Sequence, residues 1–160
     1  MPGKLQQEIQ QTKAIRLLEE EAALNIMRTA DVLMLALADV LKPLVLSATQ
    51  YNVLRILRGA GNGGASCKDI GARLVARDPD ITRLMDRLEQ RGLVSRDRAK
   101  QDRRVVTHRL TGAGLELVNE LDRPIEALHR KTMGHLKAAK LRELVELLEQ
   151  ARAGSQATAP

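Results

Sequence analysis

The chain has 160 residues, of which 44% are hydrophobic and 29% charged, a composition that suits one domain of ordinary size or one domain with an added oligomerisation element. Its formal net charge of +6 favours a polyanionic partner, since a basic surface attracts phosphates. Aromatic residues make up only 1% of the chain, which argues against a single-strand or RNA binder that stacks bases on aromatic side chains.

The N-terminal part is expected to form one long helix behind a polar arm. Residues 1–15 form the arm, which lacks the apolar core of a signal peptide. From about Leu17 to Leu41, apolar residues recur at three- and four-residue spacing on more than one stripe, which indicates a helix buried within a domain or between subunits. Its longest apolar run, 32–38, is too short to cross a bilayer. We therefore expect a soluble, cytoplasmic protein without membrane contact.

Capping signals predict the next two helices. Ser47 and Gln50 have the spacing of a capping box, which begins a helix over about 48–58. The glycine-rich stretch 59–64 lacks the Lys-Ser/Thr ending of a phosphate-binding loop and is interpreted as a turn. The same capping pattern recurs at the start of a short helix over about 66–76.

The following helix has an apolar and a polar face. Asp78 as the N-cap and Pro79 as the first helical residue predict where it begins, and Gly92 ends it. One stripe faces the core and consists of Ile81, Leu84, Met85 and Leu88. The opposite face carries Arg83, Asp86 and Gln90, flanked by Thr82 and Arg87. Such a helix can enter a major groove and present its first residues, Thr82 and Arg83, to base edges.

A short hairpin with a basic tip follows. Residues 93–96 and 105–111 have the composition of strands, and residues 97–104 form the tip. The basic residues in or beside the tip are Arg96, Arg98, Lys100, Arg103 and Arg104. Residues 66–110 hold twelve basic and seven acidic residues, a net of +5, which is nearly the whole excess. Two short helices and a hairpin in this order are typical of a winged helix-turn-helix, which binds duplex DNA; the alternative is a solvated basic face.

The C-terminal part is expected to be helical. Thr111 caps a helix from about Gly112, which must bend or break near Pro124. A last amphipathic helix covers about 136–151 and has an apolar face wide enough to need a partner. The tail, 154–160, is expected to be disordered.

The stretch from Leu46 to Gly114 resembles the MarR family of bacterial transcriptional regulators. The resemblance is carried, in this order, by Leu46-Ser47-Ala48-Thr49-Gln50-Tyr51, Ile81-Thr82-Arg83-Leu84-Met85-Asp86-Arg87-Leu88-Glu89, Gly92-Leu93-Val94, Asp102-Arg103-Arg104 and Leu110-Thr111-Gly112-Ala113-Gly114. It implies a mainly α fold with a small β-hairpin wing. It also divides the chain into a polar arm (1–15), dimerisation helices (16–45 and 111–152), a winged helix-turn-helix DNA-binding lobe (46–110) and a disordered tail (153–160).

The resemblance also implies a homodimeric repressor on a pseudo-palindromic operator, with a recognition helix in each major groove and each wing in the adjacent minor groove. In the family an aspartate buttresses the wing-tip arginine, and here these residues are Asp102 and Arg104. We expect Asp86 to pair with an arginine of its own domain. The expected DNA contacts are Asp80, Thr82, Arg83 and Arg87 in the recognition helix, Arg98, Lys100, Asp102, Arg103 and Arg104 in the wing, and Ser66 and Lys68 in the preceding helix.

Members of the family bind small, often phenolic or anionic, effectors, which implies a pocket that draws on Met27, Met34, Tyr51 and Arg55. The alternative is that the methionines simply pack a core. Cys67, the single cysteine, excludes an intrachain disulfide framework and suits a reducing compartment. It is either a sensing residue, as cysteines are in some relatives, or a small buried or incidental one.

Neither catalysis nor metal binding is indicated. The histidines have no metal-binding spacing, and no catalytic arrangement stands out; they are His108, His129 and His135. We therefore expect neither an enzyme nor a cofactor. Two other functions stay open beside a regulator: a sequence-tolerant architectural DNA-binding protein, and a winged-helix protein-interaction module that never binds DNA.

Overall fold

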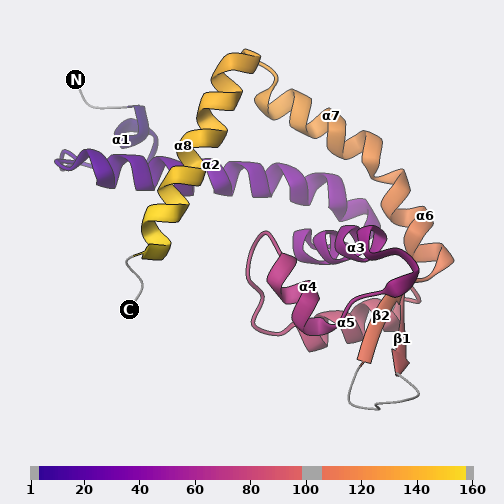
Figure 1. Cartoon of the computed structure of the whole chain (residues 1–160). Coiled ribbons are helices and arrows are strands. Elements are labelled where there is room, and N and C mark those ends of the chain that lie inside the picture. The colour runs from indigo at the N-terminus through magenta and orange to yellow at the C-terminus, as the bar shows by residue number, and fades with distance from the viewer. Residues whose placement is uncertain (1–3, 99–105, 158–160) are drawn as a thin grey trace. The chain divides into compact units, whose positions relative to one another are not determined.

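Figure 1 shows the computed structural model, which describes residues 4–98 and 106–157. These residues are mainly helical, and their strands form one antiparallel hairpin. The chain divides into two compact units, one up to Asp122 and one from Arg123 onward. The mainly α fold with a small β-hairpin, expected from the sequence, is confirmed.

The first two helices differ in length. The short α1 (Lys4–Glu8) buries Leu5, whereas α2 (Leu18–Leu41) agrees with the long helix predicted for residues 17–41. Leu41 at the C-terminal end of α2 is fully buried. The large apolar side chains of α2 that are more than 40% exposed are Leu18, Ile26, Met27, Val32, Met34 and Leu35. Burial within the single chain is therefore the wrong explanation for most of this apolar pattern, and burial between subunits stays a prediction.

Three helices form the helix-turn-helix lobe. Both α3 (Ala48–Ala60) and α4 (Cys67–Arg73) begin with the predicted capping boxes, in which the serine hydroxyl accepts from the amide three residues later at 3.1 Å. α4 ends at Arg73, earlier than the predicted end near residue 76. The third helix, α5 (Ile81–Gln90), is the predicted recognition helix.

The recognition helix begins later than predicted. Asp80, not Asp78, is its N-cap, and the Asp80 side chain accepts from the Arg83 amide at 3.3 Å. Asp78 instead accepts from the Asp80 amide at 2.8 Å, so it shapes the turn between α4 and α5, and Pro79 precedes the helix. Gly92 follows the helix with a φ of +69°, a conformation that glycine adopts without steric cost.

The hairpin consists of β1 (Val94–Arg98) and β2 (Val106–Leu110), which pair antiparallel. Ala65 adds a short bridge to this sheet through two backbone hydrogen bonds with His108, at 3.0 and 2.8 Å. Gly64, with a φ of +65°, lies against the His108 carbonyl, where a Cβ would collide. The glycine-rich loop is therefore a turn, as predicted, and it brings the start of α4 against β2.

The next two helices follow the predicted interruption. α6 (Gly112–Glu120) begins where Thr111 accepts from the Gly114 amide at 3.1 Å. α7 (Asp122–Met133) begins after a single non-helical residue, so the helix breaks just before Pro124, which then lies in the first turn of α7. The prediction of a break near this proline is confirmed.

The last helix, α8 (Ala138–Ala157), begins two residues later than predicted and continues past residue 151 into the segment that was expected to be disordered. Among the described residues, no single helix is long and apolar enough to cross a membrane. The helical segments 18–44 and 48–63 are long and apolar enough only when they are taken together, and the chain bends by 77° between them.

The core of the first unit forms where α3 packs against α2, α6 and β2. Its fully buried apolar side chains come from the helices α2 to α6 and from the residue after α6, and include Leu41, Leu54, Leu57, Ile70, Met85, Leu88, Val118 and Leu121. α3 therefore supports α4 and the hairpin, and α5 packs against α4 and β1.

Candidate nucleic-acid interface

α5 has the two faces that its sequence predicts. Three of the four residues of its apolar stripe are buried, with exposed fractions of 7%, 0% and 0% for Leu84, Met85 and Leu88, and Ile81 is half-buried. The side opposite the stripe carries the exposed Thr82, Arg83 and Arg87. The core thereby holds the helix rigidly while its polar residues point to solvent.

Asp80 and Arg83 interact at the start of this helix. Arg83 Nε lies 3.2 Å from Asp80 Oδ2, and the Arg83 side chain is 79% exposed. Asp80 thus caps α5 through the Arg83 amide and also holds the Arg83 guanidinium over the first turn. Asp80 therefore interacts with Arg83 through both the backbone and the side chain, and its predicted contact with DNA stays a prediction.

Arg96 of β1 connects the hairpin to α5. Its guanidinium forms an ion pair with Asp86, and its Nε lies 3.4 Å from Glu89 Oε2. The expectation that Asp86 pairs with an arginine of its own domain is confirmed. Arg96 is therefore engaged with α5, although its position in the sequence groups it with the basic residues of the tip.

The hairpin is also braced across its strands. Arg109 of β2 lies 2.6 Å from Asp97 of β1, and both side chains are about half exposed, at 42% and 50%. Arg98 is the last residue of β1. The other predicted wing residues, Lys100, Asp102, Arg103 and Arg104, lie outside the described part of the chain, so the buttress of Arg104 by Asp102 stays a prediction.

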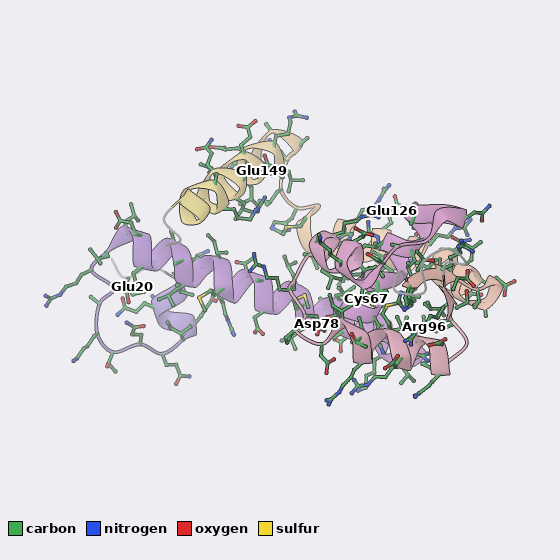
Figure 2. All side chains as sticks on the ribbon, turned by 60° about the horizontal axis from the view of Figure 1, so that its bottom comes forward. Glu20, Cys67, Asp78, Arg96, Glu126 and Glu149 are labelled. Atoms are coloured by element: carbon green, nitrogen blue, oxygen red, sulfur yellow. The ribbon has the colours of Figure 1, made fainter. Side chains whose placement is uncertain are left out.

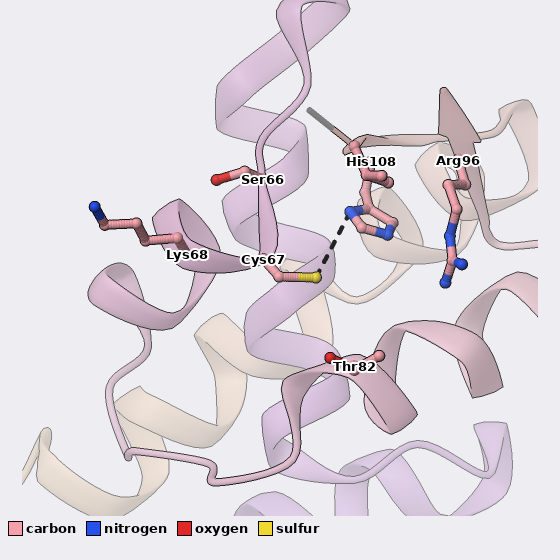
Figure 3. A pocket seen from close by; sticks show the side chains of 7 residues that line it. Ser66, Cys67, Lys68, Thr82, Arg96 and His108 are labelled. Carbon is pink, nitrogen blue, oxygen red and sulfur yellow. Dashed lines mark hydrogen bonds between the residues drawn. The ribbon is translucent and has the colours of Figure 1, made fainter. Parts of the chain in front are cut away.

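A cavity of about 500 Å³ opens between α4, α5 and the hairpin. Its lining residues are Ser66, Cys67, Lys68, Thr82, Arg96, Val106 and His108, and Figure 3 labels all of them except Val106. Three of these residues, Ser66, Lys68 and Thr82, were predicted to contact DNA. The structure brings them together on one side of the lobe, although they come from two helices.

Two titratable side chains meet at this cavity. Cys67 Sγ lies 3.9 Å from Nδ1 of His108, whose side chain is only 1% exposed (Figure 3). Burial raises the pKa of the Cys67 thiol. Burial, together with the positive charge of Arg96, lowers the pKa of His108. Both groups are therefore neutral near pH 7.

Two arginines connect helices of the lobe to neighbouring segments through hydrogen bonds. Arg91, just after α5, donates to the carbonyls of Leu44 and Val45 at 2.9 and 2.8 Å. Arg58 of α3 donates to both carboxylate oxygens of Asp122 at 2.9 Å. This bidentate contact lowers the pKa of Asp122, and it fixes α3 against the end of the first unit.

The residues predicted for an effector pocket are only partly brought together. Tyr51 is buried, and the Arg55 guanidinium carbon lies 5.8 Å from the centre of its ring. Met27 and Met34 are 67% and 48% exposed on α2, so they do not pack the core of the single chain. Burial is the main reason that the pKa of Tyr51 is raised.

In Figure 2, Cys67 and Arg96 lie within the helix-turn-helix lobe, and Asp78 lies in the turn that joins α4 to α5. Within the described ranges, no group of three or more His, Cys, Asp or Glu side chains could hold a metal ion.

Comparison with known proteins identifies the fold. The sequence profile of the MarR family matches residues 46–106. A MarR transcription factor from Planctomyces limnophilus is 43% identical, with 85% of this chain and 98% of that chain covered and a TM-score of 0.66. The homoprotocatechuate degradative operon repressor of Escherichia coli is 30% identical over 66% of this chain and 70% of its own length.

The chain belongs to the MarR family. It is therefore a DNA-binding transcriptional regulator and not an enzyme. A cysteine-to-serine mutant of MarR from E. coli, solved in complex with operator DNA, is 26% identical to this MarR-family chain. That alignment covers 86% of this chain and 99% of the other, with a TM-score of 0.74.

Two features of this MarR-family lobe were not predicted from the sequence. Residues two apart on a strand share a face, so Arg96 points to the same side as the buried Val94 and reaches α5. The alternation along β1 could have predicted that direction. His108 lies between Val106 and Leu110 on the same face of β2, so alternation could have predicted its direction, whereas its full burial depends on the bridge from Ala65.

Proposed function

We propose that this MarR-family protein is a repressor that binds a pseudo-palindromic operator as a homodimer, with α5 in the major groove. The observation that carries the proposal is the orientation of α5, whose apolar stripe is buried while Thr82, Arg83 and Arg87 face outward. A major groove admits a helix, an arginine pairs bidentately with guanine, and a threonine contacts a base edge or a thymine methyl.

The wing enters the adjacent minor groove in this proposal. The ion pairs of Arg96 with Asp86 and Glu89 support it, because they hold β1 at a fixed position relative to α5. Simultaneous contact with two grooves needs such a fixed spacing. Arg104 reads the narrow minor groove, and Ser66 and Lys68 bind phosphates that set the register.

The exposed apolar side chains of α2 support a homodimer. Met27, Val32 and Leu35 are 67%, 50% and 61% exposed in the single chain. Apolar surface of this kind is covered in a stable protein, and a second copy of the chain is the occupant that gives a two-fold assembly. That symmetry matches a palindromic operator.

A small phenolic or anionic effector relieves the repression in this proposal. The relative at 30% identity is named for repression of an operon that degrades homoprotocatechuate, which is a phenolic acid. Tyr51 and Arg55 lie together and supply a hydroxyl and a positive charge, and Met27 and Met34 offer exposed apolar side chains on α2. Effector binding is tested by adding phenolic acids to the protein–duplex complex and measuring its dissociation.

Selection of duplexes from a random pool tests the DNA proposal. The expected result is enrichment of one pseudo-palindrome that two chains bind together, as sedimentation of the complex reports. Competition with random duplex then decides between the candidates. Near-equal affinity for selected and random duplex would replace the repressor by an architectural DNA-binding protein. Absence of binding to any duplex at low salt would favour a protein-interaction module.

A further inference from the structure

We propose that Arg91 is a positioning residue for duplex binding, because it holds a strained turn that joins α2 to the helix-turn-helix lobe. A short 3-10 helix, Lys42–Leu44, follows α2, and Val45 comes next. The Arg91 guanidinium donates to the carbonyls of Leu44 and Val45 at 2.9 and 2.8 Å, and we call these two hydrogen bonds the Arg91 clamp. The effect on DNA rests on the proposed function, whereas the clamp itself does not.

Val45 has a backbone conformation that valine rarely adopts. Its φ and ψ are 53° and 42°, in the left-handed region. A β-branched side chain crowds the backbone there, whereas glycine has no Cβ and meets no such cost. The Val45 side chain is 78% exposed, so its own packing does little to offset the strain. The turn is therefore held in this shape by other contacts.

The backbone around Val45 forms a turn that usually ends a helix at a glycine. The Val45 amide donates to the Lys42 carbonyl at 3.0 Å. The Leu46 amide donates to the Leu41 carbonyl at 3.3 Å. These two bonds make the Schellman pattern, with Val45 at the position that favours glycine. Carbonyls at the end of a helix lack partners within it, so the charged guanidinium of the clamp stabilises a turn that the valine opposes.

The turn sets the direction of the lobe relative to α2. α3 begins shortly after it and supports α4 and the hairpin. Arg91 directly follows α5, so the clamp connects the end of the recognition helix to the same turn. In a two-fold dimer that pairs through α2, the direction of each lobe fixes the distance between the recognition helices, and an operator has one half-site spacing. Release of the turn therefore misplaces α5 without removing a contact to DNA.

Unfolding in urea tests the strain in the turn. Val45→Gly removes the strain, so we expect the midpoint of unfolding to rise. Val75→Gly is the matched control, because Val75 is 89% exposed and, among the described residues, is not one of those with a positive φ. Its midpoint should fall, since glycine gives the unfolded chain more freedom. A midpoint of Val45→Gly at or below that of the wild type overturns the proposal.

Duplex binding tests the positioning role. We expect Arg91→Gln to lose at least about tenfold in affinity for the selected duplex, about threefold or less for random duplex, and to keep the wild-type salt dependence. Arg87→Gln is the control, because Arg87 is an exposed arginine of α5 that we expect to contact DNA. It should lower the slope of log affinity against log salt. Equal losses of Arg91→Gln on both duplexes, or a slope lowered by about 1, would make Arg91 a phosphate contact and overturn the proposal.

Two further variants separate the clamp from the charge of Arg91. Arg91→Lys keeps the charge but lacks the planar fork that reaches two carbonyls, so it should lose affinity as Arg91→Gln does. Val45→Gly added to Arg91→Gln should restore affinity for the selected duplex to within about threefold of the wild type, because glycine keeps the turn without the clamp. Wild-type affinity of Arg91→Lys, or no recovery in the double variant, overturns the role of the clamp.

A wild-type protein that binds no duplex would refute the proposed function, and hydrogen exchange then decides the clamp. The Leu46 amide, which closes the turn, should exchange faster in Arg91→Gln than in the wild type. Its exchange should be slow again when Val45→Gly is added. Equal exchange of the Leu46 amide in Arg91→Gln and in the wild type overturns the clamp.

Discussion

The Arg96 guanidinium binds the Asp86 carboxylate and so fastens the first strand of the hairpin to the polar face of α5. The two side chains are 30% and 45% exposed, so the pair contributes only about 0.5 kcal/mol to stability. Its larger effect is geometric, because it sets the direction of the wing relative to the recognition helix.

Asp86→Asn should therefore weaken duplex binding more than it weakens the fold. We expect a loss of about 1 kcal/mol or less in the free energy of unfolding, measured in urea, and a clearly larger loss in affinity for the selected duplex. Asp31→Asn is the matched control, since Asp31 also pairs with an arginine, Arg28, at 3.7 Å on α2. Equal affinity losses in both variants would contradict the geometric role.

Arg83→Ala should reduce base selectivity. The expected cost is about 1–3 kcal/mol in binding free energy, with relaxed preference at one base position of the selected site. Arg130→Ala is the control, because Arg130 has the same 79% exposure and also pairs with an acidic residue, Glu126, of its own helix. An unchanged affinity and unchanged base preference in Arg83→Ala would remove this residue from the interface.

The wing variants should separate two kinds of contact. Arg103→Ala is expected to weaken all duplexes about equally and to lower the slope of log affinity against log salt by about 1, as for a phosphate contact. Arg104→Ala should weaken binding most to duplexes with a narrow minor groove. The affinity of both variants is measured as a function of salt concentration, on A-tract duplexes and on duplexes of mixed sequence. Identical behaviour of the two variants would contradict the assignment.

His108 should make stability depend on pH. Burial lowers the pKa of His108 below its usual value of about 6.5, so the unfolded chain takes up a proton first as the pH falls. The stabilisation is complete above that value and is lost as the pH falls below it. Urea unfolding between pH 7 and 5 should show a smaller slope for His108→Gln than for the wild type. His129→Gln should keep the wild-type slope, and a wild-type slope in both variants would exclude His108 as the cause.

The sequence predicts the parts of the lobe that local rules determine. The capping boxes at Ser47 and Ser66, the buried stripe of α5 and the break before Pro124 all depend on spacing within a few residues. The pairing of Asp86 with an arginine could also be predicted from the sequence, because a carboxylate on the polar face of a basic helix attracts a nearby cation.

The remaining features depend on contacts between distant segments. Asp78 and Asp80 flank the same proline, and only the turn from α4 decides which of them caps α5. The burial of His108 requires the bridge from Ala65, 43 residues earlier in the chain. Whether the apolar residues of α2 face a core or solvent depends on which elements pack against them, and a periodic pattern does not contain that information.

The exposed apolar side chains of α2 give the proposed homodimer a dependence on protein level. Two chains must meet before these side chains are covered, so the fraction of paired chains falls steeply when the protein is diluted. A half-operator held by one chain lacks the second set of contacts that makes binding tight. A cell that makes little of this protein would therefore express the target genes before any effector arrives, and control of synthesis becomes a second input to the same operator.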